Sequence, residues 1–591
     1  MRTFETFPNL MTMFFARATE KGDAPFLWAK QAGVWTPLSW AQVAKQVASF
    51  AGALKAQGLK PGDRVVLVSE NRPEFCIADL AIMTAGCVTV PTYTTNTERD
   101  HTHILENSGA RAVIVSTAKL AQTLLPAVVR SSTCEFVISM EALAASSVRC
   151  LSFAELAGNP NADAAAAAAS VANVGRDELA CLIYTSGTGG APRGVRQHHG
   201  SILCNVEGCL DILAHDFGWG EEVFLSFLPL SHAYEHSGGQ FLPIGLGGQI
   251  YYAEGLEKLA ANIEEVGPTI MVVVPRLFEL IRGRLIKTIE KQGGIGKKLF
   301  DKAMEIGARD QLRLTDYPYK MLIDLLLKPK VAKRFGGRIK ALVSGGAPLN
   351  PEVGHFFSSL GLTLLQGYGQ TEAGPVISCN RLRAGIRNDT VGPPMKGVEI
   401  RIAEDGEILV RGELVMHGYW RNEAETERVL RDGWLYTGDI GLLDAKGRLR
   451  ITDRKKDLIV NDKGDNIAPQ KVEGMLTLQP EIAQAMVSGD KRPYVVGLVV
   501  PDQEWLAGWA KEHGLKPDLR ALRDNAELLK ALSASVDRVN ADLSVIEKVR
   551  RIIIADEPFS IENEQMTPSM KNRRHAIRAV YGERIDALYG G

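Results

Sequence analysis

Short β-branched runs alternate with helix-length amphipathic segments in the first part of this 591-residue chain, and this alternation constrains the fold most strongly. The run RVVLVS at 64–69 is followed by the helical pattern EFCIADLAIMTAG and then by VTVPTY. The pattern returns with ARAVIVS at 110–116 and a helical stretch from Thr117. Strand, helix and strand in succession predict β-α-β units, so we expect an α/β fold with a largely parallel sheet.

The pattern changes near Gly392, where short alternating strands and tight turns replace the longer repeats. Asp405-Gly406 separates two such runs in GVEIRIAEDGEILVRG, and this dipeptide is a hairpin signal. We therefore predict a β-rich subdomain over about 392–452.

A chain of this length exceeds one ordinary hydrophobic core, so more than one domain is expected. Beyond Asp453 a charged segment precedes a mixed α and β pattern that continues to the end of the sequence. We predict a large N-terminal domain over 1–453, with parallel and mixed sheets flanked by helices. A small α+β C-terminal domain is predicted over 457–591, with the boundary near Lys456.

Charge and cysteine content exclude several classes of function. The formal net charge of -1 and the lack of basic and aromatic interleaving argue against nucleic acid as a partner. The eight cysteines form no C-x-x-C pair, so neither a zinc site nor a disulfide framework is predicted. The N-terminal residues do not fit a signal peptide, and no apolar run is long enough for a membrane span. A cytoplasmic location is therefore expected.

The stretch YTSGTGGAPRGV, from Tyr184 to Val195, has the composition of a phosphate-binding loop. Its glycines leave backbone amides free to face an anion, its hydroxyls add donors, and Arg193 adds a permanent positive charge. A flexible glycine-rich turn is the alternative interpretation. The G-K-[ST] order of a P-loop is missing, so a kinase or P-loop ATPase is not favoured. From the pattern we expect a strand, a loop and then a helix over 201–213.

Other polar clusters follow apolar runs. LVSGGAPLN at 342–350 places a glycine pair after a strand, and LTLLQGYGQTEAGP at 362–375 offers Tyr368 for stacking and the Glu372 carboxylate for Mg²⁺. Asp439 lies in the glycine-flanked turn WLYTGDIG, and Lys571 lies in a basic stretch. Each of these could alone be an ordinary turn or a solvated charged run.

Together, in their order along the chain, these motifs resemble the core motifs of the adenylate-forming superfamily of acyl-CoA synthetases, luciferases and peptide-synthetase adenylation domains. The motifs LPLSHAYE and VPRLFE and the long insertion between Phe278 and Val343 add a resemblance to the long-chain fatty acyl-CoA synthetases. The motifs that carry the resemblance are YTSGTGGAPRGV, FLPLSHAYEH, VPRLFE, SGGAPL, QGYGQTE, YTGDIG, DRKKDLIVNDKGDNIAP and MTPSMK.

The resemblance implies a fatty acid-CoA ligase that uses ATP, Mg²⁺ and coenzyme A. A substrate carboxylate would attack the α-phosphate of ATP, releasing diphosphate and forming acyl-AMP, and the CoA thiol would then displace AMP. The fatty acid would be the substrate, and no obligatory protein partner is predicted. The acyl-chain tunnel is expected near 242–252 or beside the helix after Pro275.

The resemblance also implies a role for each matching position. Lys571 would bridge the carboxylate and the α-phosphate, His232 would lie where the acyl group meets the nucleotide, and Thr371 would bind the α-phosphate. A satisfied core histidine is the competing interpretation of His232. The metal ligand would be Glu372. The nucleotide-binding positions are Thr185, Ser186, Gly187, Thr188, Gly189, Gly190 and Arg193 for the phosphates, Gly345, Gly346, Ala347, Gln366, Gly367, Tyr368 and Gly369 around the adenine, and Asp439 and Arg454 for the ribose.

Lys456 matches the family hinge, about which a mobile C-terminal domain would rotate between the two half-reactions. That rotation would withdraw Lys571 and bring the loop around Gly464 to the site to form the pantetheine channel. The chain departs from the family pattern where Gly189 replaces Thr or Ser and Arg193 replaces Lys. His236 stands where the long-chain group often has Arg.

The insertion carries an unusual charge. Residues 282–338 contain 15 Lys plus Arg and 6 Asp plus Glu, a local excess of +9. Apolar groups such as MLIDLLL at 321–327 are interleaved with these charges. Peripheral contact with the inner face of an anionic membrane is one prediction for this segment, and a solvated helical face is the other.

Two further functions stay open at this stage. A fatty acyl-AMP ligase would carry out the same first step and load a carrier protein, although the chain has no obvious extra insertion before Asp453. A non-catalytic nucleotide- or acyl-binding adaptor is suggested by Gly189 and Arg193. The retention of Glu372, Asp439, Arg454 and Lys571 argues against it.

Overall fold

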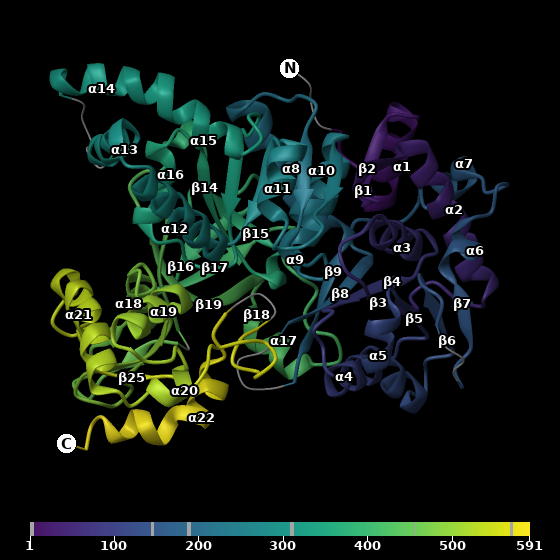
Figure 1. The fold of residues 1–591 in the computed structure, drawn as a ribbon. Coiled ribbons are helices and arrows are strands. Elements are labelled where there is room, and N and C mark those ends of the chain that lie inside the picture. The colour runs from purple at the N-terminus through teal and green to yellow at the C-terminus, as the bar shows by residue number, and fades with distance from the viewer. Residues whose placement is uncertain are drawn as a thin grey trace.

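The computed structural model describes residues 5–143, 147–185, 191–307, 313–455, 457–567 and 571–590. Two large sheets with helices between and around them make up the first part of the chain (Figure 1). The expected α/β fold is confirmed.

The first large sheet has the strand order β7-β6-β5-β3-β4-β8-β9. Its strands run parallel from β7 to β8, and only β9 is antiparallel to its neighbour among the described strands. The strands and the helix predicted near residues 64–116 are β3, α3 (Pro73–Thr84), β4 and β5. The strands are β3 Arg64–Val68, β4 Val88–Thr92, β5 Ala112–Val115, β6 Phe136–Ser139, β7 Cys150–Ser152, β8 Leu179–Thr185 and β9 Arg193–His198.

The helices around this sheet are α2 Trp40–Ala56, α3 Pro73–Thr84, α4 Glu98–Ser108, α5 Ala118–Arg130, α6 Phe153–Ala157 and α7 Ala164–Ser170. Every residue of α3 except Glu74 is buried, because this helix lies in the large core that includes residues of both sheets. A helix that is apolar on all sides is typical of such a position.

The second large sheet has the order β15-β14-β13-β12-β10-β11-β1-β2. The pairings from β14 to β1 are parallel, and the two outer pairings are antiparallel. The carboxyl ends of β12, β13 and β14 therefore lie at the same edge. The strands are β1 Pro25–Gln31, β2 Val34–Ser39, β10 Val223–Ser226, β11 Gln249–Tyr252, β12 Ile270–Val273, β13 Ala341–Ser344, β14 Leu364–Gly369 and β15 Val376–Cys379.

The helices that accompany the second sheet include a π-helical turn, η1, which the sequence did not predict. They are α1 Leu10–Lys21, α8 His199–Asp216, α9 Ala233–Glu235, η1 His236–Phe241, α10 Leu242–Leu246, α11 Leu259–Val266, α12 Pro275–Gln292, α16 Pro351–Ser359, and the 3₁₀ turns η4 Thr371–Ala373 and η5 Leu382–Ala384.

A buried polar contact joins the two sheets through α3 and η1. His236 Nε2 lies 2.9 Å from Asp79 Oδ2, and both side chains are inaccessible to solvent. The amide of Gln240, one turn further along η1, donates to the same oxygen at 2.6 Å. Because both groups on η1 reach one carboxylate of α3, the contact fixes the π-helical turn against the first sheet.

The insertion forms a run of helices at the edge of the molecule, where α14 projects in Figure 1. After α12 come α13 Gly294–Gly307, η2 Leu314–Asp316, α14 Tyr317–Leu322, the π-helical η3 Ile323–Leu327 and α15 Lys328–Arg334. In the described part of the chain, no helix is long and apolar enough to cross a membrane.

The predicted β-rich segment forms a sheet of order β16-β17-β19-β18, with β20 paired to β19. The Asp405-Gly406 turn joins the antiparallel β16 and β17, and Gly406 has a φ of +83°, which glycine adopts without strain. The elements are β16 Glu399–Ile402, β17 Glu407–Arg411, α17 Glu423–Val429, β18 Leu430–Arg431, β19 Trp434–Leu443 and β20 Leu449–Arg454.

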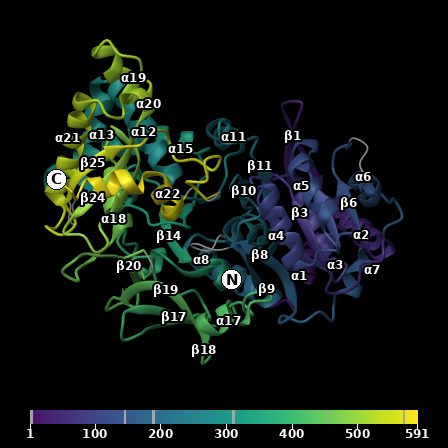
Figure 2. The same cartoon turned by 90° about the horizontal axis from the view of Figure 1, so that it is seen from below.

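The C-terminal elements mix helices and strands around cores of their own. Figures 1 and 2 show them on the side of the molecule away from β3 to β6. The predicted hinge residue, Lys456, lies outside the described residues. The elements are β21 Ile459–Val460, β22 Asn466–Ile467, α18 Pro469–Leu476, β23 Ile482–Ser488, β24 Val495–Pro501, α19 Gln503–Glu512, α20 Leu519–Leu522, α21 Ala526–Asp542, β25 Val549–Ile554 and α22 Arg574–Ala587.

Candidate active site

The glycine-rich loop closes a hairpin rather than leading directly into a helix. Thr185 at the end of β8 pairs with Arg193 at the start of β9, and α8 begins only at His199. The predicted order of strand, loop and helix was therefore wrong, because the RGVRQH segment pairs antiparallel with β8 before the helix starts. The predicted phosphate contacts Ser186, Gly187, Thr188, Gly189 and Gly190 lie outside the described residues.

Arg193 is held by two side chains that follow the β-rich sheet's first hairpin. One of its terminal nitrogens donates to Glu425 Oε2 at 2.6 Å, and the guanidinium lies 4.6 Å from the centroid of the Tyr419 ring. The hydroxyl of Tyr419 donates to Glu372 Oε1 at 2.8 Å. Tyr419 therefore contacts both a predicted phosphate ligand and the predicted metal ligand.

Sequence reasoning missed Tyr419. It is remote in sequence from both of its partners, and its flanking residues carry no glycine-rich signal. The predicted metal ligand nevertheless suits Mg²⁺, which in proteins binds one or two carboxylates together with substrate phosphates and water. Glu372 supplies such a carboxylate on the wall of the cavity described below.

The ends of β13 and β14 bring two of the predicted motifs together. Ser344 pairs with Gln366, so the SGGAP turn and the GYGQTE turn leave the sheet side by side. A Cβ atom at Gly345 would lie 2.8 Å from the ring of Tyr234, whose hydroxyl donates to the Val343 carbonyl at 2.8 Å. The glycine is therefore required for the close approach of this ring.

Asp439 is the centre of a second polar group. It pairs with Arg454 across β19 and β20, and Arg454 Nε donates to Asp439 Oδ1 at 3.1 Å. The hydroxyl of Tyr368 donates to Asp439 Oδ2 at 2.6 Å. Burial, followed by the Asp439 charge, raises the pKa of Tyr368, so its hydroxyl stays a donor. Each carboxylate oxygen keeps a second lone pair for a ligand.

Lys571 faces this group from the C-terminal part of the chain. Burial and the charge of Arg454 lower its pKa to about 8, against the opposing effect of Asp439, Asp457 and Glu372. Burial and Lys571 together lower the pKa of His232 to about 4, so this imidazole is neutral at physiological pH. Its Nδ1 accepts from the backbone N–H of Tyr234 at 3.2 Å.

One cavity of about 2390 Å³ collects most of these residues. Polar atoms near its wall, Ser344 Oγ and Gln366 Oε1, are buried and have no hydrogen-bond partner among the described residues. Unpaired buried polar atoms are rare in native proteins, which supports a polar ligand at this edge of the sheet. The predicted residues that line the cavity are Thr185, Arg193, His232, Gly345, Gly346, Ala347, Gln366, Gly367, Tyr368, Gly369, Thr371, Glu372, Asp439, Arg454 and Lys571.

Comparison with family models covers nearly the whole chain. The model described as AMP-binding enzyme matches residues 14–420, and the model described as AMP-binding enzyme C-terminal domain matches residues 456–591. The chain belongs to the AMP-binding enzyme family. It is an adenylate-forming ligase, and the resemblance to that superfamily is confirmed.

Two curated relatives of this AMP-binding enzyme match it over most of both chains. Long-chain-fatty-acid–CoA ligase FadD15 of Mycobacterium tuberculosis is 33% identical over 98% of this chain and 97% of its own. Long-chain-fatty-acid–CoA ligase 6 of Mus musculus is 30% identical over 96% of this chain and 83% of its own.

Solved structures share the fold of this AMP-binding enzyme. The adenylation domain of a carboxylate reductase from Mycobacterium chelonae has a TM-score of 0.77 and 21% identity, covering 99% of this chain and 92% of that one. The A domain of a carboxylic acid reductase from Segniliparus rugosus, in complex with AMP, has a TM-score of 0.76 and 22% identity, covering 99% and 94%.

Part of the wall of this cavity is apolar, and we call it the apolar pocket of the AMP-binding enzyme. Of the two predicted tunnel regions, 242–252 contributes only Leu242 to the described lining, and α12 contributes its first turns through Pro275, Arg276 and Glu279. The rest of the pocket was not predicted, because its residues have the same apolar spacing as ordinary core positions. These residues are Cys209, Ile212, Leu213, Gly238, Ile270, Val272, Ala341 and Val343.

One predicted residue does not reach the cavity. Gly464 lies in the turn between β21 and β22 and is absent from the described lining. Its φ of +87° and the open space around it fit an exposed turn.

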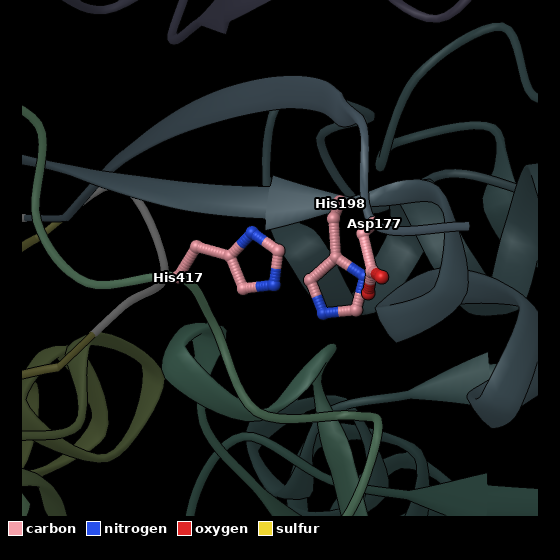
Figure 3. Close-up of side chains that lie close together, drawn as sticks. All are labelled: Asp177, His198 and His417. Carbon is pink, nitrogen blue, oxygen red and sulfur yellow. The ribbon is translucent and has the colours of Figure 1, made fainter. Parts of the chain in front are cut away.

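Asp177, His198 and His417 form a separate cluster, in which their ligand-type atoms lie within 4.8 Å of one another (Figure 3). The two imidazole rings are stacked, with centroids 4.1 Å apart. Both ring nitrogens of His198 already contact backbone groups: Nδ1 faces the Arg176 carbonyl at 3.0 Å and Nε2 the Val415 carbonyl at 3.2 Å. Stacked rings, with both nitrogens of His198 already in contact with carbonyl groups, do not suit a metal ion. We interpret the cluster as a structural contact between β9 and the segment before Tyr419.

Proposed function

We propose that this protein is a fatty acid-CoA ligase that forms acyl-CoA, AMP and diphosphate from a fatty acid, ATP and CoA. The observation that supports it most is the apolar pocket, whose residues line the same cavity as His232 and Lys571. A carboxylate bound beside Lys571 would place its hydrocarbon tail in this pocket, where burial of each CH₂ contributes about 0.8 kcal/mol. The names of the two curated relatives favour the same substrate.

The first half-reaction follows from the polar side of the cavity. A carboxylate oxygen attacks the α-phosphorus of ATP, the bond to the bridging oxygen breaks, and diphosphate leaves with that electron pair. Two anions must approach each other in this step, and the Lys571 ammonium would neutralise charge between them. Arg193 and Thr185 would bind the phosphates. Asp439 would accept hydrogen bonds from the ribose, and Gly345 and Tyr368 would lie along the adenine.

Mg²⁺ would be held by Glu372 and would shield the negative charge of the phosphates. The Tyr419 hydroxyl orients that carboxylate through the hydrogen bond to Oε1. Orientation of a metal ligand by a second hydrogen bond commonly affects metal affinity. In the neutral imidazole of His232, Nδ1 accepts from the backbone, so the proton lies on Nε2, where it would donate to the acyl carboxylate.

For the second half-reaction we propose a rotation of residues 457–591 about Lys456. In the arrangement described here Lys571 lines the cavity and Gly464 does not. This suits adenylation, and a rotation would exchange the two. The CoA thiolate would then attack the acyl carbon and release AMP. We propose a cytoplasmic enzyme on the basis of the cysteine pattern.

The competing proposals differ in the acceptor or in the chemistry. A fatty acyl-AMP ligase would transfer the acyl group to a carrier protein, and an adaptor would bind nucleotide or acyl group without reaction. Nothing in the described cavity favours either over the CoA ligase.

The test measures diphosphate and AMP release by purified protein with Mg-ATP and saturated fatty acids of graded length, with and without CoA. CoA-dependent release that is greatest with long acids, and that Lys571→Ala abolishes, would support the proposal. Diphosphate release without thioester would favour the carrier-protein ligase, and no release with any acid would favour the adaptor.

A variant within the pocket tests the substrate class. A Cβ at Gly238 would lie 3.2 Å from Val272 Cγ2, so Gly238→Val fills the pocket between η1 and β12. We expect Gly238→Val to shift the preference toward shorter acids without changing AMP affinity. An unchanged length profile would contradict the assignment of the pocket.

A further inference from the structure

The helices from α14 to α15 have one buried face and one exposed apolar face. Ile323, Leu327 and Val331 are buried in the core cluster that also contains residues of α12, α13 and α16. This line of side chains at intervals of four residues attaches the helices to the body of the protein. The attachment leaves the opposite face free.

The exposed face carries several large apolar side chains. We call Tyr317, Met321, Leu322, Leu325 and Leu326 the apolar strip, and their exposed fractions are 58, 60, 40, 65 and 48%. The spacing of three and four residues places them on one side of the helix.

Exposed large hydrophobic side chains are concentrated at the apolar strip rather than spread evenly over the protein. Seventeen large hydrophobic side chains are exposed in the described part of the protein, and six of them lie within residues 317–326. Single exposed hydrophobics are normal on a protein surface, but a contiguous group of this kind marks an interaction site.

Unpaired positive charge surrounds the strip. Lys320, Lys330 and Lys333 are exposed, and none forms an ion pair with a described residue. Asp324, an acidic residue on the same helix, pairs with Lys328 at 2.6 Å. The net charge beside the strip is therefore positive, as in the whole of 282–338.

We propose that the apolar strip docks on an anionic lipid bilayer, with its leucine and methionine side chains between the headgroups and its lysines on lipid phosphates. The strip begins on α14, which lies at the edge of the molecule (Figure 1), and its side chains are exposed. Exposed apolar side chains flanked by free lysines match the surface of an anionic bilayer, where the acyl chains are apolar and the headgroups are negatively charged.

This proposal does not rest on the ligase activity. Binding to vesicles requires neither ATP nor an acid, so its failure would leave the proposed function untouched. If the docking proposal and the proposed function are both correct, the strip would hold the enzyme at the bilayer, where long-chain acids are concentrated.

The experiment is cosedimentation of the full-length protein with vesicles of phosphatidylcholine alone, or mixed with phosphatidylglycerol, at low and high salt. We expect binding only to the mixed vesicles and its weakening by salt. The triple variant Lys320→Gln, Lys330→Gln and Lys333→Gln should weaken binding on the order of 100-fold. Each basic residue near such a surface contributes about equally to the binding free energy, and the variant removes three.

A second variant tests the apolar part. Leu325→Ser with Leu326→Ser should weaken binding by about tenfold or more, because less apolar surface is buried. A matched control, Val545→Ser with Val580→Ser, changes two exposed valines elsewhere and should bind as the wild type does. Equal binding by all variants, or no binding of the wild type, would overturn the proposal. A wild-type dimer in solution that the leucine variant converts to a monomer would overturn it too, by assigning the strip to a second copy.

Discussion

Replacement of Asp439 by asparagine is the sharpest test of the nucleotide site. The carboxylate has four lone pairs on its two oxygens, and Tyr368 and Arg454 occupy one on each oxygen, at 2.6 and 3.1 Å. Two remain for the two ribose hydroxyls. Asp439→Asn reduces the number of lone pairs that this side chain offers, with almost no change in its volume.

An asparagine would have to direct its carbonyl oxygen toward Arg454, because two donors cannot face each other. Its amino group would then face Tyr368, which can rotate its hydroxyl to accept. Only one lone pair would remain for the ribose, so one charge-assisted hydrogen bond is lost. The loss corresponds to about 1.5–3 kcal/mol, or roughly 10- to 150-fold weaker binding.

Isothermal titration with AMP measures this loss without any acid substrate. Tyr368→Phe is the matched control. It removes a hydroxyl that donates to the carboxylate but leaves every lone pair that the ribose uses. It should therefore weaken AMP binding by less than tenfold. The melting temperature of both variants reports whether the fold is retained. Binding of AMP by the folded Asp439→Asn protein within threefold of the wild type would refute the ribose assignment.

Two other predictions concern groups on the cavity wall. Tyr419→Phe should raise the Mg²⁺ concentration needed for half-maximal diphosphate release by about tenfold, because Glu372 loses the hydrogen bond that orients it; an unchanged Mg²⁺ dependence would rule this out. The pKa of Lys571 is about 8, so kcat/KM for ATP should fall about tenfold per pH unit above that value as the ammonium is lost, measured as diphosphate release at limiting ATP. Lys571→Arg keeps its charge at these pH values and should lack this alkaline fall, whatever its rate; a fall at the same pH in both proteins would assign it to another group.

The sequence predicted the strand-end residues of the site and the β-α-β order because those features are local. An apolar run followed by glycines, as at Gly345, marks a strand that ends at a turn. Parallel pairing then brings separate strand ends to one edge. The register of β13 and β14 confirms this reasoning.

Other parts of the site depend on contacts between remote segments. Tyr419 contacts Glu372 and Arg193 only because the fold brings the β-rich part of the chain against η4 and β9. Leu213 on α8 has the apolar spacing of a core residue, and nothing local distinguishes a side chain that lines a pocket from one that fills a core. The strand β9 was missed for a related reason, since RGVRQH shows weak alternation and depends on β8 for its pairing.

The contact between Asp79 and His236 has an evolutionary consequence. The two residues are 157 positions apart, inaccessible to solvent, and joined between the two sheets. Leaving a buried polar group without its hydrogen-bond partner typically costs about 1–3 kcal/mol, a sizeable part of the stability of an ordinary domain. A lineage that replaces either residue by one unable to keep this hydrogen bond would therefore need a compensating change at the other position. The two positions are therefore expected to vary together.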